Sequence, residues 1–221
     1  MKISPQRRIL TANDRRAAAN RERFEQLGLA TVNVLASPGA GKTSLILALL
    51  RALPKDLAAG VIEGDVASCI DTDRIKAEGF PAVQINTAGG CHLTADMVDR
   101  ALTSLNVRGP GFLFIENIGN LICPAAFDLG ERLRLVVASV PEGDDKPIKY
   151  PGIFASADAV ALNKIDLLAL ADFDLERFRG GIRAVNPHAS VFHVSCRTAE
   201  GVPSLRDWLL GRGTPDRGGS K

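Results

Sequence analysis

Short apolar runs alternate with amphipathic stretches along most of this 221-residue chain. Residues 30–35 (ATVNVL) form a short apolar run typical of a buried strand, whereas residues 43–53 carry leucines at helical spacing. The alternation predicts strands over 30–35, 60–63, 82–86, 111–116, 133–140, 157–162 and 190–194, and helices over 12–27, 43–53, 71–78, 95–105, 174–185 and 204–210. Because strands that alternate with helices pair in parallel, we expect an α/β fold, a mostly parallel doubly wound sheet with helices on both faces.

The length of the chain suits one domain with an appendage. Residues 1–28 predict a basic, Ala- and Arg-rich helical extension packed on the outside, residues 29–210 the main domain, and residues 211–221 a flexible C-terminal tail. The polar, Gly- and Pro-rich segment 141–151 is expected to be a loop. The turns that follow parallel strands share one edge of the sheet, where ligands bind. Residues directly after the predicted strands are therefore the first candidates for a functional site.

Composition narrows the class of protein. The chain is 46% hydrophobic and 24% charged, as in ordinary globular proteins, and its formal net charge is only +2. Residues 1–28 hold seven Lys and Arg against three Asp and Glu, so the rest of the chain is slightly acidic. That balance excludes a dedicated nucleic-acid binder. With no apolar run long enough for a signal peptide or membrane span, and four cysteines too few for a disulfide framework, we expect a cytoplasmic protein without a membrane partner.

The turn after the first strand carries a phosphate-binding pattern. Residues 36–43 (ASPGAGKT) match G-x-x-x-x-G-K-[ST] except at the first position, where Ala36 replaces glycine and must take up its backbone conformation. Backbone N–H groups would cradle the phosphates, Lys42 would place its charge on the β and γ oxygens, and the Thr43 hydroxyl would reach Mg²⁺. The alternative is an ordinary Gly-rich turn. The residues expected to contact the nucleotide here are Ser37, Pro38, Gly39, Ala40, Gly41, Lys42, Thr43 and Ser44.

A second motif selects the base. Asn163, Lys164 and Asp166 form the sequence NKID directly after a predicted strand, and residues 195–197 follow the next strand. The Asp166 carboxylate can accept hydrogen bonds from the N1–H and 2-amino group of guanine, which adenine does not offer in that arrangement. The motif therefore favours GTP, although the aspartate could instead cap a helix. The expected base-loop residues are Asn163, Lys164, Asp166, Ser195, Cys196 and Arg197.

Carboxylates at three strand ends or helix starts are candidates for Mg²⁺ binding and water activation. Asp65 and Glu116 are the expected metal-shell residues, with Thr43 as a further Mg²⁺ ligand, and Asp71 is a candidate to orient the attacking water. We expect Lys42, Asp71 and Glu116 to be catalytic. Because no Gln or Arg is placed to complete the site, intrinsic GTP hydrolysis should be slow.

A second group of side chains suits a transition metal. Cys91 and His92 follow two glycines after a strand, and Cys123 lies four residues beyond Gly119 in the next switch-like segment. Two thiolates and an imidazole suit Zn²⁺ or Ni²⁺, but they are one ligand short of a tetrahedral site, which invites solvent or a second copy of the chain. The residues alone fit a buried cysteine with a capping histidine better than a metal site.

Several longer motifs carry a family resemblance. They are EGDVASCIDTDRI (63–75), QINTAGGCHL (84–93), FIENIGNLICPAAFDLGE (114–131), EGDDKPIKYP (142–151) and LNKIDLL (162–168). The chain resembles the hydrogenase nickel-incorporation GTPases, the HypB family of the SIMIBI class of P-loop proteins, from about residue 13 to residue 208. The resemblance implies that Cys91, His92 and Cys123 form a nickel or zinc site within a GTPase domain, and that Lys146 and Lys149 contact the nucleotide or a second copy.

The resemblance also implies a function and partners. It implies a GTP-dependent homodimer that passes nickel to the large subunit of [NiFe]-hydrogenase, helped by a zinc-binding accessory protein of the HypA type. We expect GTP hydrolysis to move the segment between Gly119 and Cys123, and so to gate metal transfer and dimerisation. Two alternatives are a urease-maturation GTPase, whose Cys-Pro-His metal motif is absent here, and a non-catalytic nucleotide-binding module with a structural zinc.

Overall fold

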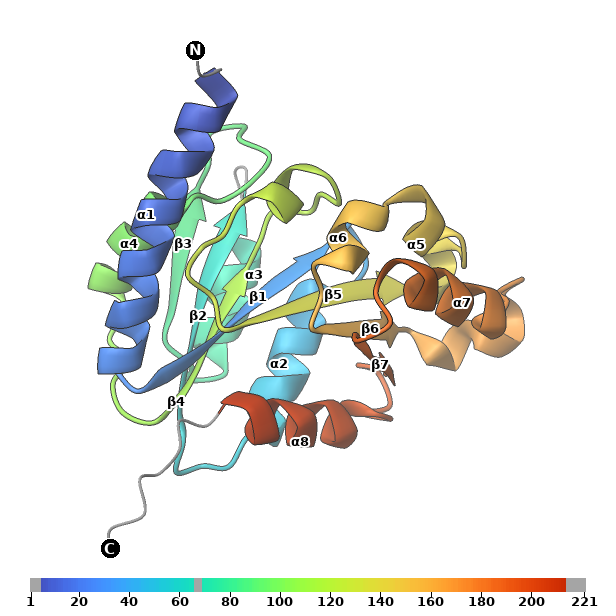
Figure 1. The fold of residues 1–221 in the computed structure, drawn as a ribbon. Helices are drawn as coiled ribbons and strands as arrows, with labels where there is room; N and C mark the ends of the chain where they lie inside the picture. Colours follow the sequence, from blue (N-terminus) through green and yellow to red (C-terminus); the bar gives the residue numbers. More distant parts are fainter. Residues whose placement is uncertain (1–4, 66–68, 214–221) are drawn as a thin grey trace, which may run out of the picture.

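The predicted α/β fold is confirmed in a computed structural model, which describes residues 5–65 and 69–213. Seven strands form one sheet in the order β3-β2-β4-β1-β5-β6-β7, and every pair of neighbours is parallel. The strands are β1 (Leu29–Ala36), β2 (Ala58–Asp65), β3 (Ala82–Asn86), β4 (Gly111–Glu116), β5 (Leu133–Ser139), β6 (Ala159–Asn163) and β7 (Ser190–His193). The carboxyl ends of β1, β2, β4 and β6 therefore lead into one edge of the sheet, where the predicted motifs begin (Figure 1).

Helices cover both faces of this sheet. The α-helices are α1 (Pro5–Gln26), α2 (Lys42–Ala52), α3 (Ile70–Ala77), α4 (Ala95–Ser104), α5 (Lys146–Lys149), α6 (Pro151–Ala155), α7 (Leu175–Val185) and α8 (Val202–Gly213). Three short 3₁₀ segments are η1 (Cys123–Ala126), η2 (Val140–Glu142) and η3 (Ile165–Leu170). In Figure 1, α1 and α4 lie side by side over the β3 half of the sheet, and α5, α6 and α7 lie together at the β6 and β7 end.

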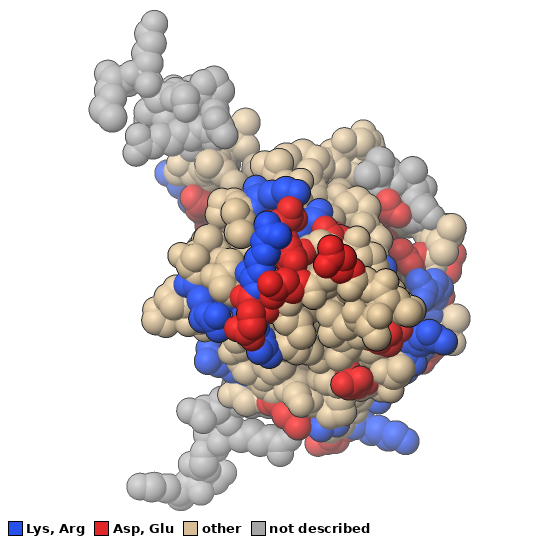
Figure 2. Space-filling view, turned by 90° about the vertical axis from the view of Figure 1, so that its right-hand side faces the viewer, with Lys and Arg blue, Asp and Glu red and all other residues tan. Residues whose placement is uncertain are grey.

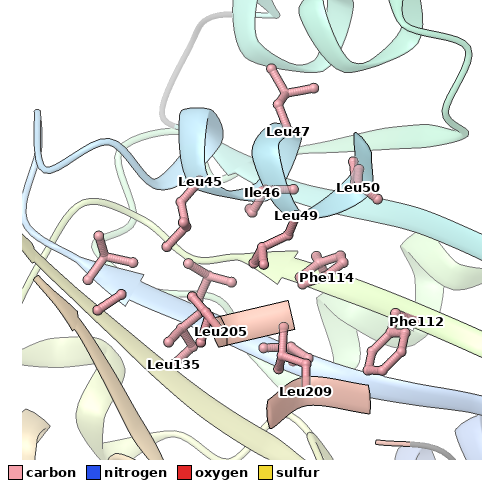
Figure 3. Packing of buried hydrophobic residues seen from close by; sticks show 14 of the residues in the cluster. Leu45, Ile46, Leu47, Leu49, Leu50, Phe112, Phe114, Leu135, Leu205 and Leu209 are labelled. Carbon is pink, nitrogen blue, oxygen red and sulfur yellow. The ribbon is translucent and has the colours of Figure 1, made fainter. Parts of the chain in front are cut away.

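The first face of the sheet is covered by α2 and α8. Leucines of α2 meet Leu205 and Leu209 of α8, together with Phe112 and Phe114 of β4 (Figure 3). Leu45 and Leu49 are four residues apart and so share the face of α2 that points toward the sheet, whereas Leu47 points to the opposite side of the helix. This packing fixes the first turn of α2, and hence Lys42 and Thr43, against the end of β1.

The second face holds two separate apolar clusters. One lies under α1 and α4 and includes Leu29 of β1, and the other lies under α6 and α7 and includes Leu35 of the same strand. Side chains two residues apart on a strand share a face, so Thr31 and Asn33 lie between the two clusters. Both are buried. A polar strip therefore crosses the middle of this face.

The N-terminal helix starts earlier than predicted and is tied to the body of the protein. It begins at Pro5 instead of residue 12. Phe24 is 2% exposed within the α4 cluster. Asn20 donates to the carbonyl oxygens of Ala95 and Leu129, at 2.8 and 3.0 Å, and the Asn13 side chain accepts from the Ala95 N–H at 2.9 Å. The division of the chain at residue 28 stays a prediction, and this helix covers part of the sheet.

The expected loop over residues 141–151 is wrong. The structure has η2, α5 and α6 in this stretch instead. Pro141, Pro147 and Pro151 each stand at the start of a short helix, where a proline loses no hydrogen bond. Residues 211–213 of the predicted tail belong to α8, and residues 214–221 lie outside the described residues.

Charge is mixed on the side of the molecule that holds α5 and α7. Figure 2 shows basic and acidic side chains interspersed there. Ion pairs join Lys149 to Asp145 at 2.5 Å and Arg177 to Asp144 at 3.3 Å. Such pairs on the surface neutralise each other and contribute little to stability. Within residues 5–65 and 69–213, no helix is long and apolar enough to cross a membrane.

Candidate nucleotide and metal site

The phosphate-loop pattern forms a strand-to-helix turn at the predicted edge. Ala36 is the last residue of β1, pairs with Val137 of β5 and is buried. Its φ is not positive, since the only non-glycine residues with positive φ in the described chain are Ala88, Lys164 and Ala199. The expectation that Ala36 must imitate a glycine is therefore wrong, because this position is still strand. Lys42 and Thr43 open α2, where unpaired N–H groups favour an anion.

The phosphate loop and the base loop are locked together. Asn163 donates from Nδ2 to the Ala40 carbonyl at 2.9 Å and accepts from the Cys196 N–H at 3.3 Å. Gly41, at φ 99°, passes so close that a β-carbon there would lie 2.5 Å from Asn163 Nδ2. Lys164 donates to the Gly39 carbonyl at 2.7 Å. The predicted residues 37–44, 163–166 and 195–197 thus form one connected set.

The base-reading carboxylate is held in a fixed orientation. Ser195 donates from its hydroxyl to Asp166 Oδ1 at 2.6 Å, and Arg197 lies 3.8 Å from Oδ2. The Asp166 side chain is 17% exposed, so its second oxygen stays reachable at the rim. Burial raises the pKa of the neighbouring Cys196 thiol to about 11, which keeps it neutral. These residues make a rim on which a guanine edge could be bound.

Glu116 lies beside the phosphate loop and is poised for a cation. Thr43 donates from its hydroxyl to Glu116 Oε1 at 2.8 Å, and Glu116 is 4% exposed. Its other oxygen, Oε2, is buried and has no hydrogen-bond partner among the described residues. Burial raises the Glu116 pKa to about 7, and the positive charge of Lys42 opposes that rise. A buried carboxylate oxygen that lacks a partner fits a bound metal ion such as Mg²⁺.

A second buried carboxylate, Glu63, was not among the predicted site residues. Glu63 of β2 is directly opposite Glu116 of β4 in the sheet and is 2% exposed. Thr72 donates to its Oε2 at 3.0 Å. Burial raises the Glu63 pKa to about 7, and the negative charges of Glu116, Asp65 and Asp71 add to the rise. The structure therefore gathers four acidic side chains at this edge, with Asp71 also paired to Arg74 at 2.9 Å.

The raised pKa of Glu63 makes stability depend on pH in a definite direction. The folded protein holds a proton on Glu63 up to about pH 7, whereas the unfolded chain releases it near 4.5, so stability falls as the pH rises between these values. We expect Glu63→Gln to raise the unfolding midpoint by about 3–6 °C at pH 8 and by much less at pH 4.5. Calorimetry without nucleotide at both pH values measures this.

An exposed glutamate gives a control of opposite sign for this experiment. The Arg51 hydrogen bond lowers the pKa of Glu78, so its ionised form supports folding. Glu78→Gln should therefore leave the midpoint unchanged or slightly lower at pH 8. If Glu63→Gln brought no stabilisation at pH 8, the ionised form of Glu63 would not destabilise the folded protein, and its pKa would not be raised.

Glu142, in the segment first expected to be a loop, supports the phosphate loop. It contacts the Ser37 hydroxyl, accepts from the Ser139 hydroxyl at 2.8 Å and lies 3.7 Å from Lys146 Nζ. Lys146 also lies over the Tyr150 ring, 5.2 Å from its centre. Lys146 is therefore next to the phosphate loop, whereas Lys149 pairs with Asp145 on the outside. An acidic residue just after β5, at the ligand-binding edge, is the signal that could have found Glu142.

The three predicted transition-metal ligands lie near one another, without forming a finished site. The Cys91 sulfur is 3.5 Å from His92 Nδ1, and a hydrogen bond with the Cys123 thiol raises the Cys91 pKa. The His92 ring stacks on Phe127, with ring centres 3.8 Å apart, and its burial lowers the His92 pKa, which favours the neutral imidazole that binds metals. No group of three or more His, Cys, Asp or Glu converges on a metal position within the described residues.

The switch-like segment after β4 touches the phosphate loop. A β-carbon on Gly119 would lie 3.0 Å from atoms of Pro38, so only glycine allows this approach without displacement. Asn120 accepts hydrogen bonds from the N–H groups of Ile122 and Cys123, at 2.8 and 3.2 Å. Cys123 starts η1 directly afterwards. One short turn therefore joins the phosphate loop to a predicted metal ligand.

Comparison with known proteins agrees with this arrangement. Residues 30–193 match the CobW/HypB/UreG nucleotide-binding domain. The chain is 51% identical over 201 residues to the hydrogenase maturation factor HypB of Azotobacter vinelandii, covering 91% of this chain and 66% of that protein. It is 45% identical over 201 residues to the HypB of Escherichia coli K12, covering 91% of this chain and 69% of that protein. The chain thus spans about two thirds of the length of these relatives.

A solved structure extends the likeness to three dimensions. The crystal structure of HypB from Helicobacter pylori in complex with nickel superposes with a TM-score of 0.87 at 37% identity, covering 91% of this chain and 95% of that one. The family match over residues 30–193 includes the phosphate loop, residues 163–166 and the segments that hold Cys91, His92 and Cys123. On sequence and fold together, the chain belongs to the HypB family of nucleotide-binding proteins.

Proposed function

We propose that this chain is a GTP-hydrolysing nickel chaperone that serves assembly of the [NiFe]-hydrogenase metal centre. The observation that carries the proposal is the continuity of two sites: Gly119 contacts Pro38 of the phosphate loop, and Cys123 lies four residues further on beside Cys91. The names of the relatives, hydrogenase maturation factor, and the nickel in the Helicobacter structure support the cargo and its destination.

The nucleotide end uses the residues described above. The N–H groups at the start of α2 bind the phosphates, Lys42 neutralises charge on the transferred phosphoryl group, and Asp166 reads the guanine edge. Asp71 accepts a hydrogen bond from the attacking water and so orients it. The water oxygen bonds to the γ-phosphorus while the bond from that phosphorus to the bridging oxygen breaks, giving GDP and phosphate. No Gln or Arg of the described chain is assigned to complete the site, so turnover of the isolated chain is slow.

The carboxylates at this edge fit Mg²⁺. The unpartnered Glu116 Oε2, the Thr43 hydroxyl and Asp65 at the end of β2 form a set of hard oxygen donors. These residues would hold the ion, which when bound neutralises charge on the β- and γ-phosphates. A bound cation also favours the ionised form of Glu116, so loading the site releases a proton near neutral pH.

The metal end is completed by a second copy of the chain. Cys91, His92 and Cys123 give three soft or borderline donors, one short of a tetrahedral set, and Ile122 beside them is 69% exposed. A two-fold interface across this surface would bring both donor sets together and bury the apolar side chain. We propose that GTP and metal favour this homodimer, and that a HypA-type accessory protein and the hydrogenase large subunit receive nickel from it in the cytoplasm.

A genetic test addresses the destination of the metal. A strain lacking this chain should lose [NiFe]-hydrogenase activity and retain urease activity, and the intact chain should restore the first. Loss of urease with normal hydrogenase would assign the chain to urease maturation instead. Lack of any effect on either enzyme, in cells that make both, would favour a non-catalytic module with a structural zinc.

Nickel binding gives a second prediction. Cys123→Ala should lower the Ni²⁺ affinity of the purified chain about a hundredfold, because one of three donors is lost. Cys91→Ala should have an effect of the same size, and isothermal titration measures both. Cys69, exposed at the start of α3, provides a matched control, and Cys69→Ala should bind as the parent chain does. Parent-like affinity in both Cys91→Ala and Cys123→Ala would remove these residues from the metal site.

A further inference from the structure

A chain of buried hydrogen bonds connects the nucleotide segment to both metal segments, and it starts at Asn117. Asn117 follows Glu116 at the end of β4 and is completely buried. Its side-chain oxygen accepts from the N–H of Ile118 at 3.0 Å and from the N–H of Leu93 at 3.3 Å. Leu93 directly follows His92. One amide group therefore holds the switch-like segment and a metal-ligand segment together.

The nitrogen of the Asn117 amide bonds to a residue within the sheet. Its Nδ2 donates to the side-chain oxygen of Asn33 at 3.2 Å, and Asn33 donates in turn to Glu131 Oε1 at 3.1 Å. Glu131 Oε2 accepts from the Leu129 N–H at 2.7 Å. Asn33 is fully buried and Glu131 is 7% exposed. Asn33 belongs to the polar strip, described above, that separates the two apolar clusters on the second face of the sheet.

Arg134 carries the chain of contacts to the second metal segment. It donates from Nε to Glu131 Oε1 at 2.6 Å, and its two terminal nitrogens donate to the carbonyl oxygens of Ala125 and Phe127, both at 3.2 Å. These carbonyls belong to the turn that starts at Cys123. Because the Phe127 ring stacks on His92, the contacts close into a ring that returns to Leu93 and Asn117.

Such a ring has physical consequences for coupling. Because a buried amide left without hydrogen-bond partners is costly, we expect these hydrogen bonds to be kept or exchanged together. If residues 117–119 shift when the γ-phosphate is lost, either the Leu93 N–H moves with Asn117 or it loses its acceptor. Apolar residues at positions 33, 117 and 131 would fill this strip without such a constraint, as they do on either side of it.

We propose that Asn117 is a positioning residue that transmits the nucleotide state to the metal ligands, His92 through Leu93 and Cys123 through Asn33, Glu131 and Arg134. It touches neither the phosphates nor the metal in this role. The inference deepens the proposed function and rests on it, since it assumes that nickel and GTP bind to the same chain. It assigns the coupling to side-chain contacts in addition to the short peptide link between Gly119 and Cys123.

The test compares nickel affinity in two nucleotide states. In the parent chain, the Ni²⁺ dissociation constants measured with GDP and with a non-hydrolysable GTP analogue should differ by about 5–150-fold, the usual range for coupled sites. In Asn117→Ala the ratio should fall to within about twofold of one, with Ni²⁺ and the GTP analogue still binding. By linkage, Ni²⁺ should change the affinity for the GTP analogue in the parent chain and not in the variant.

Two further variants guard against a purely structural effect. Asn186→Ala removes an amide that donates to three backbone carbonyls beside α6 and α7, and it should lose stability while keeping the parent ratio. Arg134→Lys keeps a positive charge beside Glu131 but loses the fork to Ala125 and Phe127, and its ratio should fall even if Asn117→Ala does not fold.

The outcomes separate the inference from the proposed function. If the parent ratio survives in Asn117→Ala, or in Arg134→Lys where the first variant does not fold, the assignment of Asn117 is wrong and the nickel chaperone function stands. If the parent chain itself binds Ni²⁺ equally in both nucleotide states, nucleotide control fails and the inference fails with it. If Asn186→Ala abolishes the ratio as well, the effect is one of general stability and the assignment is overturned.

Discussion

Lys42→Ala is expected to lower the rate of GTP hydrolysis about a thousandfold at saturating GTP. Lys42 stands at the first position of α2, directly after Gly41, where its ammonium group faces the same buried edge as Glu116. The charge that develops on the transferred phosphoryl group would lose its nearest cation there, and no other described lysine has this position in the fold. Phosphate release at saturating Mg²⁺ and GTP measures the effect.

The same substitution has a second consequence, which a structural defect would not produce. The positive charge of Lys42 holds the pKa of Glu116 down, so its removal raises that pKa further and makes the carboxyl a weaker cation ligand at neutral pH. The concentration of Mg²⁺ needed for half-maximal nucleotide binding should therefore rise. Lys76→Ala, on the exposed end of α3, is the control and should hydrolyse GTP at the parent rate. Undiminished hydrolysis in Lys42→Ala would remove the phosphate loop from the mechanism.

The fold was predictable because its local and global patterns agree. Each strand found in the structure overlaps an apolar run of the sequence, and each long helix overlaps a predicted helix. The rule that ligands bind where parallel strands end then placed residues 36–43 and 163–166 at one edge before any strand order was known. The order β3-β2-β4-β1-β5-β6-β7 is a matter of pairing between distant segments, which no local pattern encodes.

The residues missed at the site are those whose role depends on that pairing. Glu63 lies at a predicted strand end, but its pKa of about 7 arises first from its burial within the sheet, and the negative charge of Glu116, opposite it on β4, adds to the rise. The contacts of Asn117 also depend on the pairing of distant segments, since its partners Asn33 and Leu93 lie 84 and 24 residues away along the chain. In the sequence such residues are ordinary polar side chains beside apolar ones.

The spacing of the predicted metal ligands along the sequence does not show how their side chains are arranged in space. Cys91 and His92 are adjacent, and on a regular strand they would face opposite sides, yet Thr87 to Gly90 form a turn closed by a 3.0 Å hydrogen bond between their backbones. That turn lets the two side chains lie together at 3.5 Å. Spacing could not show that the His92 ring would rest on Phe127, which orders the ring without placing it on a finished metal position.

Asp166→Asn is expected to weaken GTP binding about a hundredfold to ten-thousandfold. The Asp166 carboxylate would lose two charge-assisted hydrogen bonds to guanine, each worth about 1.5–3 kcal/mol. In the parent chain the Ser195 hydroxyl donates to Asp166 Oδ1 at 2.6 Å. The Asn side chain keeps an oxygen that can accept this hydrogen bond, so the loop should keep its shape. Xanthine carries a carbonyl where guanine has its 2-amino group, and an Asn amide can donate to it. The variant should therefore bind xanthosine triphosphate better than GTP, in competition titrations with a fluorescent nucleotide.

A change of preference from GTP to xanthosine triphosphate would show that Asp166 binds the base and does not merely support the loop. Ser195→Ala removes the hydroxyl that orients Asp166 and keeps the carboxylate, so it should weaken GTP about tenfold and bring no gain for xanthosine triphosphate. Both variants lose a contact in the same loop, and only one changes the donor and acceptor pattern presented to the base. If Asp166→Asn weakened both nucleotides alike, the aspartate would only support the loop through its contact with Ser195, and the preference for guanine would have to lie elsewhere on the rim formed by residues 163–166 and 195–197.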